Sequence, residues 1–132
     1  MRRVITPEQL KFFDTVFIES LVALATIGIY DWEKEIKQRL ELDIVMYWDN
    51  QKGGNSDDVN DCLDYAAISQ CVLDYINQRQ FGLIERVAEE IAKLLVLQYQ
   101  LPAVEVTVKK PTAVPSAMSV GVSVFRTLQA YQ

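Results

Sequence analysis

The feature that most constrains the fold is the alternation of side chains between residues 39 and 49. Apolar residues take every second position, and most of the positions between them are charged. The apolar set is Leu40, Leu42, Ile44, Met46 and Trp48. Successive side chains of a strand point to opposite faces, so this pattern predicts a strand with one buried face. Such a strand is typical of an antiparallel sheet that is covered on one side.

A second strand is predicted before it. Residues 15–30 are rich in β-branched and aromatic side chains, with an interruption expected near Ser20 or Gly28. Residues 31–35 predict a polar turn, so the two strands form a long hairpin. Residues 49–61 then predict a loop with glycines at its tip.

Two helices follow the loop. Asp64 is a suitable N-cap for a helix over residues 65–78, and a second helix is predicted over residues 83–99, before Pro102. Apolar residues recur at helical spacing in both. The stripes are Tyr65, Ile68, Val72, Tyr75 and Ile76 in the first, and Ile84, Val87, Ala88, Ile91 and Leu95 in the second.

Two more alternating segments, residues 104–109 and 118–124, predict strands on either side of a proline-bearing loop. The order β-β-α-α-β-β predicts an α+β fold, with two helices on one face of an antiparallel sheet. We expect one domain over residues 14–132, preceded by an N-terminal extension over residues 1–13. Exposed edge strands on so small a sheet favour assembly into a homo-oligomer.

Composition excludes several functional classes. The net charge of -5 argues against a nucleic-acid binder, and no apolar run approaches the roughly 20 residues of a membrane helix. No secretory signal pattern is visible, so we expect a cytoplasmic protein. The chain has no histidine and two cysteines, which argues against a metal site. Catalysis would have to use Lys, Tyr, Glu, Asp or water.

Lys110 and Glu85 are the most informative polar positions. Strand parity from Val108 places Lys110 on the apolar side and Lys109 on the other, although Lys110 could simply extend to water. A partly buried lysine can act as an acid or base.

Glu85 lies in the first turn of the second helix, which the helix dipole alone would explain. It could also bind, together with the free amides of Ile84 and Glu85, a ring bearing an amino group, an N–H and a carbonyl.

Tyr65 and Glu33 each have a plain explanation and a functional one. Tyr65 could be a core aromatic residue whose hydroxyl still needs a partner. Glu33 could be a solvated residue of the hairpin turn. Neither residue indicates a particular function when it is taken alone.

Several blocks of the chain form a set that is more specific than any single position. They are Gly28-Ile29-Tyr30-Asp31-Trp32-Glu33, Asp57-Asp58, Leu63-Asp64-Tyr65, Phe81-Gly82-Leu83-Ile84-Glu85-Arg86-Val87-Ala88-Glu89, Lys110-Pro111-Thr112-Ala113-Val114-Pro115 and residues 120–126. Together, in this order and over about residues 14–126, they resemble the bacterial dihydroneopterin aldolase family. The resemblance implies the tunnelling fold, in which subunits form rings around a barrel, as a tetramer or octamer with active sites at subunit boundaries.

The resemblance also implies an activity that needs no metal, cofactor or Schiff base. Dihydroneopterin, a pterin, would be cleaved by a retro-aldol step to hydroxymethyl-dihydropterin and glycolaldehyde, and some members also epimerise the side chain. The implied roles follow the matched positions. Three positions would bind the substrate: Glu85 would anchor the pterin, an amide of Ile84 or Glu85 would donate to its carbonyl, and Leu63 would add a backbone contact. Lys110 would move protons through water, and Tyr65 would assist this transfer across the subunit interface. Glu33 would organise the side-chain end of the site.

Two alternatives stay open. An epimerase of dihydroneopterin triphosphate has the same fold, but its substrate calls for a basic cluster near the site. A non-catalytic pterin- or purine-binding assembly protein would keep Glu85 but would need neither Lys110 nor Tyr65. Tunnelling-fold enzymes that use histidine metal ligands are excluded by the absence of histidine.

Overall fold

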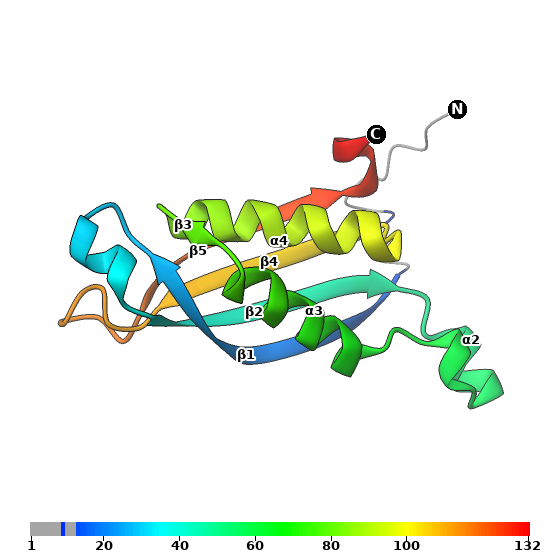
Figure 1. Cartoon of the computed structure of the whole chain (residues 1–132). Coiled ribbons are helices and arrows are strands. Elements are labelled where there is room, and N and C mark those ends of the chain that lie inside the picture. The colour runs from blue at the N-terminus through cyan, green and yellow to red at the C-terminus, as the bar shows by residue number, and fades with distance from the viewer. Residues whose placement is uncertain (1–8, 10–12) are drawn as a thin grey trace.

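The computed structural model describes residues 9 and 13–132 and has the predicted α+β fold (Figure 1). Five strands form one sheet in the order β3-β1-β2-β4-β5. They are β1 (Asp14–Ile27), β2 (Gln38–Trp48), β3 (Gln80–Phe81), β4 (Ala103–Lys110) and β5 (Val120–Thr127). The extension predicted over residues 1–13 lies outside the described residues, apart from Gln9 and Phe13.

The four long strands are antiparallel, as predicted, while the two-residue β3 runs parallel to the end of β1. The predicted interruption of the first strand is a bulge at Ser20. The β1–β2 register shifts between Ile18 and Leu21, and Ser20 has a positive φ of 52°. The backbone N–H of Ser20 donates to the carboxylate of Asp43 at 2.8 Å, which gives the bulged residue a partner.

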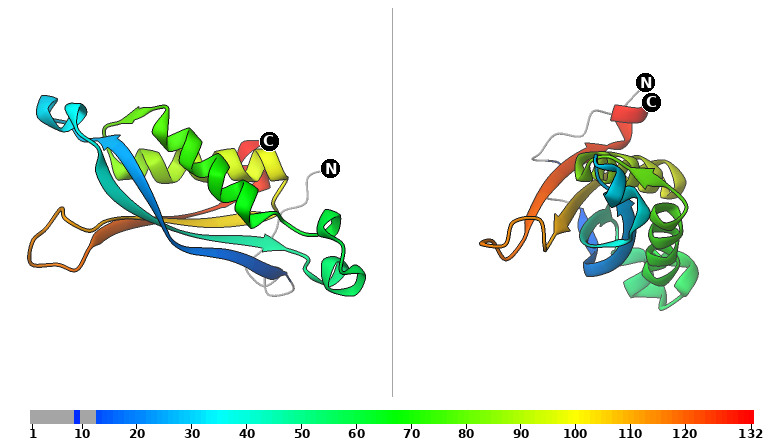
Figure 2. Two further views of the ribbon diagram at one scale, coloured as in Figure 1. Left: turned by 60° about the horizontal axis from the view of Figure 1, so that its bottom comes forward. Right: turned by 60° about the vertical axis from the view of Figure 1, so that its left-hand side comes forward.

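Two long helices, α3 (Tyr65–Asn77) and α4 (Ile84–Tyr99), cover one face of the sheet (Figures 1 and 2). Asp64 caps α3 as predicted, accepting from the Ala67 amide at 3.0 Å. Alternate residues of β2 and β4 are fully buried against the apolar stripes of the helices, as Ile44 and Val106 are. This core fixes the direction of both helices relative to the strand ends.

The structure corrects several details of the predicted elements. The predicted loop at 49–61 contains a short helix, α2 (Gln51–Ser56), and a 3-10 turn, η2 (Val59–Asp61). The first strand ends at Ile27 rather than at residue 30, because a further 3-10 turn, η1 (Asp31–Glu35), follows. The last strand begins at Val120, and Met118 is 96% exposed. A third 3-10 turn, η3 (Leu128–Tyr131), ends the chain.

Tyr65 was wrongly placed on the buried stripe of α3, since it is 64% exposed. It is the first residue of α3, three positions before the first buried residue of that helix, Ile68. Within the described residues, no helix is both long and apolar enough to cross a membrane.

Candidate active site

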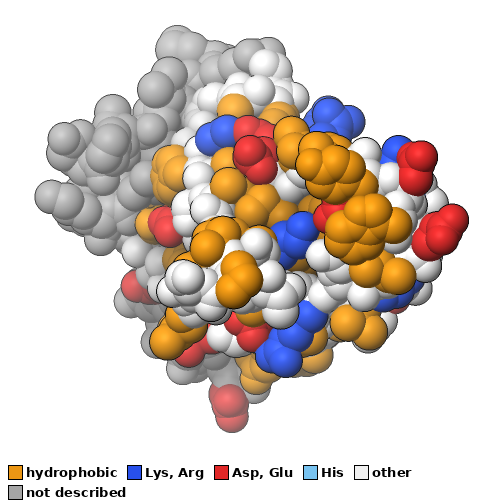
Figure 3. All heavy atoms as spheres, turned by 90° about the vertical axis from the view of Figure 1, so that its left-hand side faces the viewer, with side chains coloured by type: hydrophobic (Ala, Val, Ile, Leu, Met, Phe, Trp, Pro, Cys, Tyr) orange, Lys and Arg blue, Asp and Glu red, His pale blue; other side chains and the backbone are white. Residues whose placement is uncertain are grey.

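Four segments meet at one end of the molecule and form a pocket with a volume of about 270 Å³. They are the end of β1, the turn η1, the start of α4 and the end of β4. Lining residues are Ile27, Gly28, Ile29, Glu33, Gly82, Leu83, Ile84, Glu85, Lys110, Ala113 and Val120. Hydrophobic side chains gather on this end of the molecule, with basic and acidic side chains between them (Figure 3). The mixture of apolar walls and a few charges is typical of a small-molecule site.

Gly28 allows Glu33 to fold back into this pocket. It has a φ of 145°, a conformation that residues with a Cβ rarely adopt. A Cβ at this position would lie 2.4 Å from the Cβ and Cδ atoms of Glu33. The glycine therefore provides both the backbone conformation and the space that the glutamate side chain occupies.

Glu33 is buried, with 8% of its surface exposed, so the solvated reading of this residue was wrong. Its Oε1 accepts from the Tyr30 amide at 3.2 Å, and its Oε2 lies 3.4 Å from Gln38 Nε2 and 3.6 Å from Lys110 Nζ. The hydrogen bond from the Tyr30 amide is the main cause of a lowered pKa for Glu33. Burial raises this pKa, while Gln38 and Lys110 lower it further. Glu33 is thus held as a carboxylate beside an ammonium group.

The two adjacent lysines point to opposite faces of the sheet, as strand parity predicts. The Lys110 side chain is 19% exposed and pairs with Glu33 in the pocket. Lys109 instead pairs with Asp43 at 2.7 Å on the other face. The hydrogen bond with Asp43, and then the negative charge of Asp43, raise the pKa of Lys109. Only Lys110 lines the pocket.

The start of α4 supplies the opposite wall. Leu83 is the N-cap residue and its side chain makes no capping hydrogen bond. The amides of Ile84 and Glu85 lie in the first turn, where a helix offers them no acceptor. Glu85 is an exposed residue that lines the same pocket. Amide donors and a carboxylate therefore stand together opposite the Glu33–Lys110 pair.

Leu63 and Tyr65 are not part of this pocket. Both lie at the start of α3, beside α2, whereas the pocket lies at the other end of the sheet (Figures 1 and 2). Leu63 is buried in the core, 5% exposed, and Tyr65 is exposed. A helix of 13 residues spans roughly 20 Å, so Tyr65 cannot reach Glu85 of its own subunit.

Gln38 is a site residue that the sequence analysis missed. Its Nε2 donates to the Ile27 carbonyl at 2.7 Å and also contacts Glu33, so it ties the end of β1 to the glutamate. A signal was available, because Gln38 has the same strand parity as Leu40 and is therefore a polar residue on the core side of β2. A polar side chain on such a face usually has a specific partner.

Comparison with known proteins identifies the family of this chain. The family model described as FolB, dihydroneopterin aldolase, matches residues 16–125. Dihydroneopterin aldolase of Escherichia coli K12 is 50% identical over 86% of this chain and 93% of its own length. The enzyme of Haemophilus influenzae is 49% identical over 86% of this chain and 96% of its own length.

Solved structures agree with the sequence matches. The structure of E. coli dihydroneopterin aldolase in complex with neopterin has a TM-score of 0.83 and 50% identity, covering 86% of this chain and 98% of that one. The matched residues include α3, α4, β2, β3 and β4 in full and most of β1 and β5, and so they include every residue that lines the pocket. The chain therefore belongs to the dihydroneopterin aldolase family.

Proposed function

We propose that the pocket formed by Glu33, Glu85 and Lys110 is the aldolase site, in which dihydroneopterin is cleaved by a retro-aldol step. The observation that carries this proposal is the buried Glu33–Lys110 pair facing the first turn of α4 across one pocket. The solved relative in complex with neopterin supports a pterin as the ligand.

The pterin ring is anchored at the start of α4. The Glu85 carboxylate accepts from the amino group and the adjacent ring N–H, while the amide of Ile84 or Glu85 donates to the ring carbonyl. Hydrogen bonds to a charged group are stronger than those between neutral groups, so this carboxylate fixes the orientation of the ring. The substrate side chain then points toward Glu33 and Lys110.

The cleavage needs only proton transfers from the protein, because the substrate ring itself takes up the electron pair of the broken bond. A proton leaves the hydroxyl on the second side-chain carbon, the bond between the first and second carbons breaks, and glycolaldehyde departs. The electron pair of that bond moves into the ring C=N, whose nitrogen takes up a proton. The first carbon is then protonated and the ring nitrogen gives up its proton. Lys110, acting through water, handles the protons in this proposal, and Glu33 holds it in place.

Tyr65 completes the site from a second copy of the chain. Its distance from the pocket within one subunit, and its exposure, support a contribution across a subunit boundary. A homo-oligomer, as a tetramer or an octamer, is part of the same proposal. A cytoplasmic location stays a prediction.

The test is to incubate the purified chain with dihydroneopterin, with and without EDTA, and to measure glycolaldehyde and hydroxymethyl-dihydropterin by mass spectrometry. We expect both products in equal amounts and the same rate with the chelator. Absence of glycolaldehyde would contradict the aldolase proposal. Loss of activity with EDTA that zinc or magnesium restores would contradict the metal-free chemistry.

A further inference from the structure

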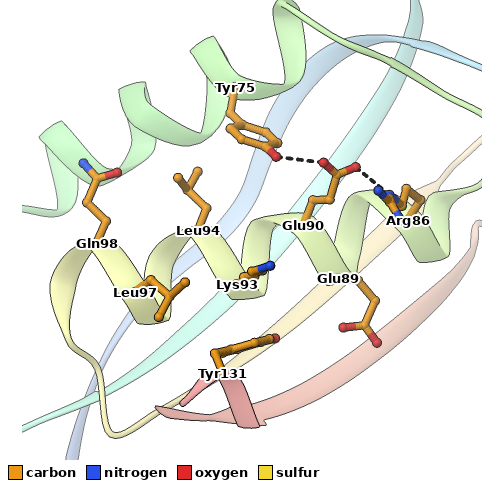
Figure 4. A pocket seen from close by; sticks show the side chains of 9 residues that line it. All are labelled: Tyr75, Arg86, Glu89, Glu90, Lys93, Leu94, Leu97, Gln98 and Tyr131. Carbon is orange, nitrogen blue, oxygen red and sulfur yellow. Dashed lines mark hydrogen bonds and ion pairs between the residues drawn. The ribbon is translucent and has the colours of Figure 1, made fainter. Parts of the chain in front are cut away.

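A second pocket, with a volume of about 610 Å³, is larger than the candidate active site and is separate from it. It lies across the outer side of α4, between α3 and η3 (Figure 4). The lining residues are Tyr75, Arg86, Glu89, Glu90, Lys93, Leu94, Leu97, Gln98 and Tyr131. The retro-aldol reaction uses none of them.

Apolar and aromatic side chains form the body of this pocket. Leu94 and Leu97 come from α4, with Tyr75 of α3 on one side and Tyr131 of η3 on the other (Figure 4). Leu97, in the last turn of α4, is 38% exposed. The surface between the two tyrosines therefore suits a flat apolar group.

Both carboxylates of the pocket already have partners. Glu90 accepts from the Tyr75 hydroxyl at 2.7 Å and from Arg86 Nε at 2.9 Å. Glu89 forms an ion pair with Arg126 of β5. These acceptors are therefore engaged within the protein.

The free groups are donors. The Tyr131 hydroxyl is buried and has no hydrogen-bond partner. Burial and then the charge of Glu89 raise the pKa of Tyr131, so its oxygen keeps the proton. The ammonium group of Lys93 makes no ion pair or hydrogen bond with any residue that the structure describes. A buried donor without a partner is unusual in native proteins, and a ligand oxygen would satisfy it.

The ion pairs around the pocket leave one cation for an anionic ligand. The lining has two basic and two acidic side chains, and each carboxylate has an arginine partner, Arg86 on Glu90 and Arg126 on Glu89. Among the described residues, Lys93 is therefore the lining cation that has no carboxylate partner. Such a group can pair with a negatively charged ligand.

We propose that this pocket binds a small aromatic carboxylate. The ring would lie on Leu94 and Leu97 between the two tyrosines, and the carboxylate would accept from Lys93 and from the Tyr131 hydroxyl. The volume is within the range of small-molecule sites, about 300–1,000 Å³. This site goes beyond the aldolase reaction and does not depend on it.

The experiment is isothermal titration of the full-length chain with naphthoate, and with naphthylmethanol as an uncharged analogue. We expect naphthoate to bind with one site per chain and the alcohol to bind at least about tenfold more weakly, because it lacks the charge-assisted hydrogen bonds. Lys93→Gln should weaken naphthoate binding about tenfold or more, and Tyr131→Phe several-fold. Lys37→Gln is the matched control and should bind as the unchanged chain does.

Three results would overturn the proposal. Equal affinities for naphthoate and naphthylmethanol would remove the role of the carboxylate. Weaker binding in Lys110→Gln, but not in Lys93→Gln, would place naphthoate in the candidate active site instead. Displacement of naphthoate by an equal concentration of inorganic phosphate would show an unspecific anion site with no need for the aromatic ring.

Discussion

Glu33 shows how much of a site depends on a single backbone position. Its burial results from the left-handed conformation of Gly28 and from the space that the missing Cβ leaves. Four polar groups then contact or surround its carboxylate: the Tyr30 amide, Gln38, Lys110 and the backbone at Ile29. Nothing in the local sequence distinguishes this arrangement from a solvated turn, so residue patterns alone led to the wrong environment.

The lowered pKa of Glu33 predicts how stability depends on pH. Its folded-state pKa lies below the ordinary value of 4.5, so the unfolded chain binds a proton before the folded chain does. The stabilising effect is therefore complete above pH 4.5 and is lost as the pH falls through the folded-state value. We expect Glu33→Gln to lower the free energy of unfolding at pH 7 and to lower it less at acid pH. Urea titrations of both chains at each pH measure this, and a difference that grows with acidification would contradict it.

The two lysines give the sharpest mutational contrast. Lys110 lines the pocket beside Glu33, whereas Lys109 is bound to Asp43 on the other face of the sheet. Lys110→Ala should lower the catalytic rate by roughly 10²-fold or more, as expected for a lost acid–base group. Lys109→Ala should reduce it much less than tenfold. Steady-state kinetics on both variants checks this, and borohydride reduction with substrate should leave no adduct on Lys110. A larger defect in Lys109→Ala, or a reduced adduct, would refute the assignment.

Glu85 should act on binding more than on chemistry. Its carboxylate stands in the pocket at the first turn of α4. Each charge-assisted hydrogen bond to the pterin is worth roughly 1.5–3 kcal/mol. We therefore expect Glu85→Gln to weaken the binding of hydroxymethyl-dihydropterin by tenfold or more. A fluorescence titration with the product measures the affinity, and an unchanged value would remove Glu85 from the anchoring role.

At the scale of elements, hydrophobic periodicity predicted the long strands and both long helices, because tertiary burial in this fold follows that periodicity. It did not predict α2 or β3. The sequence of α2 contains Gly53 and Gly54, which are poor helix formers. Its position depends instead on distant contacts, with Asn50 bonded to Asp14 and to Thr15 of β1. Likewise, two-residue β3 exists only through its pairing with the end of β1.

The N-cap of α3 allows a test of one element alone. The Asp64 carboxylate accepts from the Ala67 amide at 3.0 Å, and a polar N-cap replaced by alanine costs about 0.5–2 kcal/mol. We expect Asp64→Ala to lower the free energy of unfolding by this amount in a urea titration at fixed protein concentration. Asn77→Ala, at the other end of the helix, should change it little. Equal effects of the two substitutions would show that the cap does not stabilise the helix.

At the scale of the whole molecule, one subunit holds only part of the site expected from the family resemblance. The sequence named Glu33, Ile84, Glu85 and Lys110 as candidate site residues, and the fold brings all four to the lining of one pocket. It could not place Tyr65, because the position of a residue relative to a second subunit is not encoded in local periodicity. The sheet face away from the helices is exposed and apolar at Phe17, Val22, Leu24 and Phe125. Such a surface favours association with further copies.

Mixed oligomers test whether Tyr65 acts on a neighbouring subunit. Tyr65→Ala and Lys110→Ala should each have low activity on their own, since every site would lack one of the two side chains. If the site joins Lys110 of one subunit to Tyr65 of the next, co-expression of the two variants regenerates intact sites. Random mixing in equal amounts should restore about a quarter of the sites in a cyclic assembly. Light scattering must first show that each variant forms an oligomer whose mass is a multiple of 15.1 kDa. The co-expressed mixture must have the same mass as the separate variants. If both side chains came from one subunit, no mixed site could hold both, and activity would stay at the level of the separate variants.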